Sequence, residues 1–300
     1  MVGIRDGFPF QGIFDGDNHT ITANIVSTAT GDDMNEQGVA PFHYLRSAKI
    51  KNLTVAGSIT SASKYAAGLA GWAHNNTEFN DCVVTATITT SADYAGGFVG
   101  NMDVNSNGYY LYFTNCVFAG TINNTSSDAN RRAGGFIGYG SGYSYITNCL
   151  ENGTYTNLTL MNPRNSYNYF YNDNVTSLYY INKIGNTDKY IADGYGCHQV
   201  TKTAPTEDIY LAKAIHGYDF YQPVLVTNMY ETYPFNNGEE VALNYALKID
   251  SKTLTKDTDY EVAVSPGAPA AIGNYTITFT AKAGNETGYA GALEEGLISS

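Results

Sequence analysis

Two acidic residues near the N-terminus are the first candidates for chemistry. Asp15 and Asp17 flank Gly16, and their carboxylates are hard oxygen ligands of the kind that Ca²⁺ prefers. The surrounding residues do not match the EF-hand calcium loop, and an Asx turn at Asp15 is a second explanation of the same pattern. We therefore predict either a Ca²⁺ site or a structural turn here, and no other cofactor.

No arrangement of residues typical of catalysis is visible in the sequence. The five histidines share no spacing that fits a metal site or a catalytic triad, and neither a nucleophile elbow nor a phosphate-binding loop occurs. We assign no catalytic residues and expect that the chain is not an enzyme. The alternative is a carbohydrate-active β-helix enzyme, either a polysaccharide lyase or a glycoside hydrolase, which rests on an analogy of fold alone.

Tyrosines are the candidates for ligand binding. Exposed tyrosine rings stack on the faces of sugars, while neighbouring Asn and Asp side chains hydrogen-bond to hydroxyl groups. The alternative is that the Tyr-rich stretch only caps the repeat described next. The residues predicted to bind an extracellular glycan or a host protein are Tyr143, Tyr145, Tyr167, Tyr169 and Tyr171.

A repeat indicates the elements that position these side chains. The step Gly-x-x-Gly occurs at 68–71, 97–100 and 135–138. A second motif, in which Asn or Asp stands between an apolar-x pair and Leu or Cys, occurs at 50–53, 79–82, 113–116 and 146–149. Its Asn or Asp recurs after 29, 34 and 33 residues. A repeat of this length with strand alternation and without an amphipathic helix predicts strands stacked into a solenoid.

The last residue of the second motif predicts a buried ladder. Parallel stacking brings equivalent residues to about 4.8 Å from one another, and a free thiol behaves as a small apolar group. A metal site is disfavoured because no Cys-x-x-Cys pair occurs, and Cys197 stands outside the repeat without a role. The predicted structural core ladder consists of Leu53, Cys82, Cys116 and Cys149.

These motifs resemble the GLUG-type repeats of bacterial proteins. The repeat hallmark is a Gly-Leu/Phe-x-Gly step followed by apolar-x-Asn-Cys, and the segment 10–21 resembles the opening that precedes such repeats. The resemblance covers residues 8 to about 160. It implies a right-handed parallel β-helix in a large secreted or surface-anchored adhesin-like protein, and it implies no catalytic residues.

The C-terminal third has a different pattern. Residues 206–218 predict a short helix with Thr206 as N-cap and Gly217 as its stop. Short strands separated by turn residues follow, and the segments 254–262 and 273–277 resemble bacterial Ig-like modules, which serve as spacers and stalks.

The expected fold is all-β, with a right-handed parallel β-helix followed by an Ig-like β-sandwich. The expected domains are a GLUG-type β-helix with a Tyr-rich C-terminal cap, a linker or short helix, and the sandwich, over residues 1–205, 206–223 and 224–300.

Charge and hydropathy limit the partners of the chain. The formal net charge of −12, from 16 basic and 28 acidic residues, repels nucleic acid and anionic membranes. No apolar run reaches the roughly 18 residues of a membrane span, so we expect no membrane insertion. No secretory leader is recognisable, and we expect a fragment of a longer protein whose signal and anchor lie outside it. The expected role is adhesion or scaffolding, outside the cell or at its surface, with host or dietary glycans or proteins as ligands.

Overall fold

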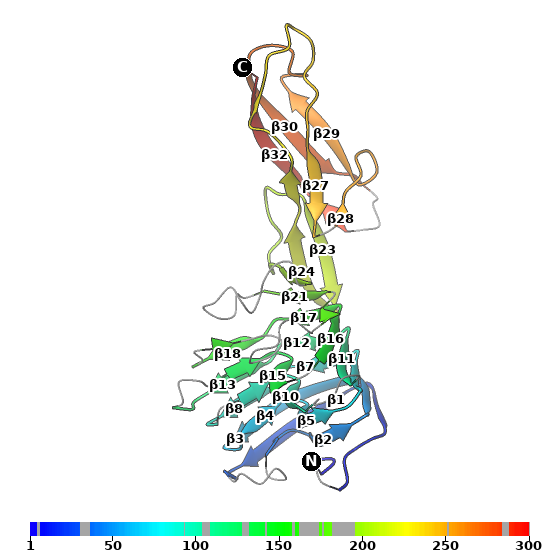
Figure 1. The fold of residues 1–300 in the computed structure, drawn as a ribbon, viewed down its shortest axis with the longest axis vertical. Helices are drawn as coiled ribbons and strands as arrows, with labels where there is room; N and C mark the ends of the chain where they lie inside the picture. Colours follow the sequence, from blue (N-terminus) through cyan, green and yellow to red (C-terminus); the bar gives the residue numbers. More distant parts are fainter. Residues whose placement is uncertain are drawn as a thin grey trace. The chain divides into compact units, whose positions relative to one another are not determined.

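The computed structural model describes residues 1–4, 7–30, 37–92, 94–103, 109–127, 132–141, 143–157, 160–161, 174–175, 177–181, 196–250, 252–283 and 288–299. All regular structure in these ranges is β-strand, and they contain no helix that could span a membrane. The chain divides into two compact units, residues 1–199 and 200–300, which are labelled by strand in Figure 1.

The first unit is a β-solenoid of about four turns built from three parallel sheets. Two of these sheets are small and have four strands each. The one that we call the second sheet consists of β2 (Phe42–Arg46), β5 (Ala70–His74), β10 (Val99–Asp103) and β15 (Ile137–Ser141). The third consists of β4 (Tyr65–Ala67), β9 (Tyr94–Gly96), β14 (Arg132–Gly134) and β19 (Leu160–Met161). The largest sheet consists of β1 (Ile13–Ser27), β3 (Lys49–Ser61), β6 (Thr77–Asn80), β7 (Val83–Val84), β8 (Thr87–Thr90), β11 (Tyr110–Thr114), β12 (Val117–Phe118), β13 (Thr121–Asn124), β16 (Tyr143–Thr147), β17 (Cys149–Glu151), β18 (Thr154–Thr156), β20 (Asn174–Val175), β21 (Leu178–Tyr180) and β22 (Cys197–Gln199).

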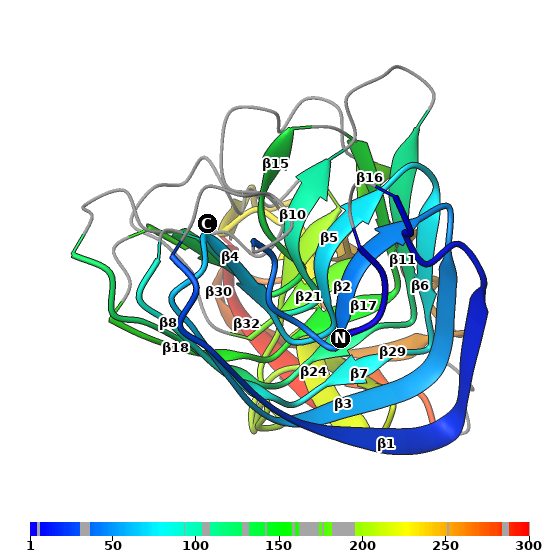
Figure 2. The same cartoon turned by 90° about the horizontal axis from the view of Figure 1, so that it is seen from below.

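Successive turns of the solenoid stack on one another, as the end-on view in Figure 2 shows. Their equivalent residues pair in register and surround one core. Phe79 pairs with Phe113 in the sheet, and their rings stack at 5.0 Å between centroids. The rings of Phe98 and Phe136 stack in the same way at 5.2 Å. The predictions of an all-β fold and of a parallel solenoid are confirmed.

The Gly-x-x-Gly steps form tight corners between the second and third sheets. A Cβ atom added at Gly97 would collide with the carbonyl oxygen of Gly135 and with the ring of Phe118. Backbones of neighbouring turns therefore approach one another at this corner more closely than a side chain allows.

The second unit contains three small sheets in which nearly all pairs are antiparallel. Only β26 and β32 pair in parallel among its described strands. The core of the unit includes Ile277, Phe279 and Leu247, all fully buried. The strands are β23 (Tyr210–Ile215), β24 (Tyr218–Pro223), β25 (Leu225–Thr227), β26 (Thr232–Tyr233), β27 (Ala246–Ile249), β28 (Lys252–Thr253), β29 (Tyr260–Ser265), β30 (Gly273–Ala281), β31 (Tyr289–Ala290) and β32 (Ala292–Ser299).

The predicted short helix over 206–218 is wrong. Strands β23 and β24 form an antiparallel hairpin there, and its two loop residues, His216 and Gly217, both have positive φ, at 50° and 79°. Positive φ at both positions defines the type I′ turn that suits hairpins. Gly217 thus closes a hairpin instead of ending a helix, and Thr206 caps no helix.

Candidate functional site

The Asn and Asp residues of the second motif form one row at a corner of the solenoid. Asn52, Asp81, Asn115 and Asn148 all adopt left-handed backbone conformations, with φ between 50° and 54°, which Asn and Asp tolerate better than other side chains. Asn115 Nδ2 donates to Asp81 Oδ1 at 3.1 Å, and Asn148 Nδ2 donates to Asn115 Oδ1 at 2.6 Å. This row stabilises the corner through hydrogen bonds between turns.

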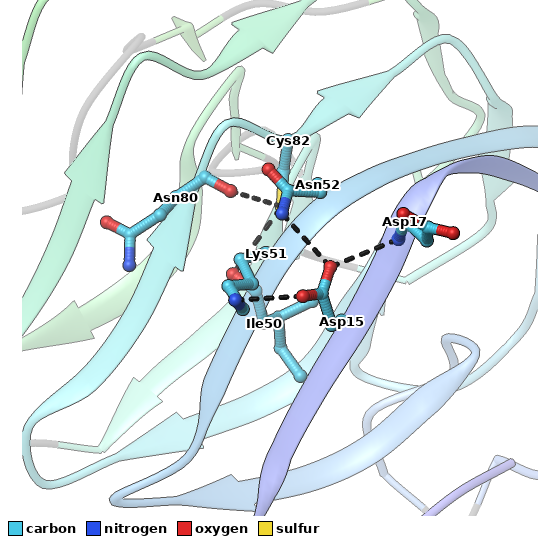
Figure 3. Close-up of polar contacts among 7 residues, drawn as sticks. All are labelled: Asp15, Asp17, Ile50, Lys51, Asn52, Asn80 and Cys82. Carbon is cyan, nitrogen blue, oxygen red and sulfur yellow. Dashed lines mark hydrogen bonds and ion pairs between the residues drawn. The ribbon is translucent and has the colours of Figure 1, made fainter.

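Asp15 lies at the start of this row (Figure 3). Its Oδ1 accepts hydrogen bonds from Asn52 Nδ2 at 3.0 Å and from the backbone N–H of Asp17 at 3.1 Å. Its Oδ2 lies 2.8 Å from Lys51 Nζ. The hydrogen bond from Lys51, and then that from Asn52, lowers the pKa of Asp15 to about 2. The carboxylate is therefore ionised at neutral pH and already faces a cation.

These contacts favour the Asx-turn explanation of Asp15 and Asp17. The bond from the Asp17 N–H to the Asp15 side chain is the bond that defines an Asx turn, and the Asp15 carboxylate already forms an ion pair with Lys51. No group of three His, Cys, Asp or Glu residues in the described parts of the chain is arranged to hold a metal ion. Ca²⁺ at this position stays a prediction.

The four residues of the predicted core ladder are all buried. The three cysteines among them are free thiols, and two of them contact the preceding turn, with Cys82 Sγ 3.6 Å from the Ile50 carbonyl oxygen and Cys116 Sγ 3.3 Å from that of Phe79. Burial is the main cause that raises the pKa of Cys116. The buried thiols therefore serve as packing groups.

Cys197 belongs to the same row, although the sequence pattern leaves this residue outside the repeat. Cys149 is in register with Leu178 of β21, and Leu178 is in register with Cys197 of β22. Cys197 is buried as well. The signal was weak because the spacing of 19 residues from Leu178 to Cys197 is far shorter than the earlier repeats.

Four tyrosines gather on the outer face of β11 and β16, and we call them the tyrosine patch: Tyr110, Tyr112, Tyr143 and Tyr145. All four side chains are half-buried. The rings of Tyr112 and Tyr145 stack at 5.2 Å with an angle of 7° between their planes. Tyr110 contacts Tyr145 edge-on at 5.0 Å and Tyr143 at 5.6 Å. The patch is therefore a continuous aromatic surface held by the register of two neighbouring turns.

Polar side chains flank the tyrosine patch. Glu78 pairs with Tyr112 across the sheet, forms an ion pair with Lys49 at 2.7 Å, and accepts a hydrogen bond from Asn80 Nδ2 at 3.2 Å. Thr114 lies two residues after Tyr112 on the same face and is half-buried. Carboxylate, amide and hydroxyl groups therefore adjoin the rings, as a sugar-binding surface requires.

The structure brings together only part of the predicted tyrosine set. Tyr143 and Tyr145 lie in the patch, whereas Tyr167, Tyr169 and Tyr171 lie outside the described residues. Tyr110 and Tyr112 were missed, although each precedes its partner by 33 residues, the spacing from Asn115 to Asn148.

A second aromatic cluster lies in the same unit and is nearly covered. It consists of Tyr44, Tyr65 and Trp72, with the half-buried Tyr94 and Tyr139 packed against them, and we call it the Trp72 cluster. Trp72 is 4% exposed and donates from Nε1 to the carbonyl oxygen of Gln37 at 3.1 Å. The Tyr65 ring contacts Trp72 edge-on at 4.9 Å. All four rings of the tyrosine patch are half-buried, whereas Tyr44, Tyr65 and Trp72 are buried.

The class of the protein is defined by its β-solenoid fold. No protein-family model matches the chain, and no curated protein or solved structure matches it significantly.

Proposed function

We propose that the chain is a non-catalytic part of a bacterial surface or secreted protein and that it acts in adhesion or as a scaffold. In this proposal the solenoid is a right-handed β-helix of GLUG-type repeats, and the second unit is an Ig-like sandwich that serves as a spacer. The antiparallel sheets of that unit are compatible with a sandwich. The rows of Asn and Cys support a structural role for the repeat, because their side chains contact neighbouring turns.

The proposed ligand is an extracellular glycan, and the tyrosine patch is the observation that carries this proposal. Its rings contact one another in the unbound chain, so little side-chain freedom is lost on binding. Glu78, Asn80 and Thr114 supply hydrogen-bonding groups beside the rings. The net charge of −12 disfavours polyanionic chains, so we expect a neutral glycan.

A glycan array probed with the 300-residue chain tests this proposal. We expect binding to neutral glycans, and we expect the double variant Tyr112→Ala/Tyr145→Ala to lose at least about tenfold in affinity, since each stacking ring contributes on the order of 1 kcal/mol. Tyr230→Ala is the matched control, because Tyr230 is 60% exposed and belongs to the second unit. Binding that both variants retain equally would contradict the site. Capture of a host protein and of no glycan would contradict the ligand class.

The same samples test whether the chain is non-catalytic. Each polysaccharide that binds is incubated with the chain and assayed for new reducing ends and for unsaturated products. We expect intact substrate throughout. Release of either product would favour the lyase or hydrolase alternative.

A further inference from the structure

Strand β1 is an edge of the largest sheet. It pairs with β3 in continuous register from His19 to Ser27, and no other described strand pairs with it. The Ser27 carbonyl oxygen accepts a hydrogen bond from the Ala62 N–H at 3.0 Å and so points toward β3. Because backbone groups of successive residues point to alternate sides of a strand, those of Thr20, Thr22, Asn24 and Val26 point away from β3. Figure 2 looks onto this end of the solenoid.

The same end of the solenoid is apolar. Six of the twelve exposed large hydrophobic side chains in the described residues lie between Met1 and Val26, with exposed fractions up to 80% at Phe8: Met1, Val2, Ile4, Phe8, Ile13 and Val26. Phe14, Ile21 and Ile25 face the core but are only half-buried. Apolar surface of this kind marks an interaction site more often than a free face.

Nothing in the paired segment of β1 protects this edge. Natural edge strands avoid association through Lys, Pro, inward-pointing charges or bulges. Residues 19–27 contain no Lys, Arg, Asp, Glu or Pro, and the shift in register lies before them, between Asp15 and His19. This segment is therefore ready to pair with a further strand.

The segment is complementary to itself. Its core-facing residues, Ile21, Ala23 and Ile25, are symmetric about Ala23. A two-fold axis at Ala23 places Ile21 opposite Ile25 of a second copy and pairs residues 19–27 with residues 27–19. Asp15 and Asp17 lie outside this stretch, so no like charges meet. We propose that two copies of the chain associate by antiparallel pairing of β1 with β1, which continues the largest sheet from one solenoid into the other.

A two-fold interface closes on itself and gives a dimer, whereas a head-to-tail contact would give filaments. In this register the exposed side chain of Thr22 faces that of Asn24 of the second copy. Charges placed at these two positions therefore report on the register itself, because cross-strand pairs attract or repel directly.

Sedimentation velocity of the full chain, over a range of concentrations, tests the proposal. We expect a dimer for the wild type and at least about tenfold weaker dimerisation for Thr22→Lys/Asn24→Lys. We expect Thr22→Lys/Asn24→Glu to restore dimerisation, because opposite charges then face each other. Thr60→Lys is the matched control, since Thr60 is exposed on β3 but pairs with a strand on both sides. Circular dichroism verifies that each variant is folded.

A wild type that stays monomeric at every concentration, or filaments in place of a dimer, would overturn the proposal. Unchanged dimerisation of the double-lysine variant would place the interface elsewhere. A Lys/Glu variant as weak as the double-lysine variant would reject the two-fold axis at Ala23.

Discussion

The Trp72 cluster and the tyrosine patch are both built from aromatic residues on neighbouring turns, yet they differ in what covers them. Trp72 and Tyr65 are at most 5% exposed, and the backbone of Gln37 accepts the indole hydrogen bond. Tyr112 and Tyr145 are half-exposed on the outer face of their sheet. The repeat puts similar residues in rows in both places. The two sets of rings differ in burial: Gln37 contacts Trp72, whereas the four rings of the patch are only half-buried.

The largest expected effect is on the covered cluster. We expect Trp72→Ala to lower the free energy of unfolding by about 3–5 kcal/mol, because a buried aromatic side chain is lost and a cavity remains. Urea unfolding followed by circular dichroism measures it. A loss below about 1 kcal/mol would mean that the cluster does not stabilise the solenoid. Tyr112→Ala is the comparison from the exposed patch, and we expect it to cost less than Trp72→Ala.

A smaller effect is expected at the row of Asn and Asp. Asn115 has a φ of 52° and hydrogen-bonds to Asp81 and Asn148. We expect Asn115→Ala to cost about 1–2 kcal/mol, since alanine is strained in the left-handed region. Asn115→Gly removes the same side chain without that strain. The same unfolding measurement should therefore rank glycine above alanine, and the reverse order would contradict the conformational explanation.

The smallest expected effect is the pH dependence due to Asp15. Its pKa of about 2 in the folded chain lies below its usual value of 3.8, so the ionised carboxylate stabilises the folded state above about pH 4. That contribution is lost as the pH falls through about 2. We expect wild type and Asp15→Asn to differ in stability at pH 6 and to converge near pH 2. An equal difference at both pH values would contradict the contacts with Lys51 and Asn52.

The sequence predicts which residues of successive turns lie in one row. It does not predict which other segments contact that row. The spacing of Cys82, Cys116 and Cys149 defines a register, and the same register extends to the four tyrosines of the patch. The Gln37 carbonyl oxygen accepts the hydrogen bond of Trp72, and the spacing of the repeat does not predict this contact. At the His216 hairpin the sequence pattern wrongly predicts a helix, because Gly217 suits a helix end as well as a type I′ turn.

We propose that the tyrosine patch binds a ligand and is not needed for folding. Isothermal titration with a glycan selected on the array, combined with urea unfolding of the same samples, tests it most directly for wild type and Tyr145→Ala. We expect the dissociation constant of the variant to rise at least about fivefold, while its free energy of unfolding stays within about 1 kcal/mol of the wild type. An unchanged dissociation constant, or a loss of binding that only accompanies unfolding, would contradict the claim.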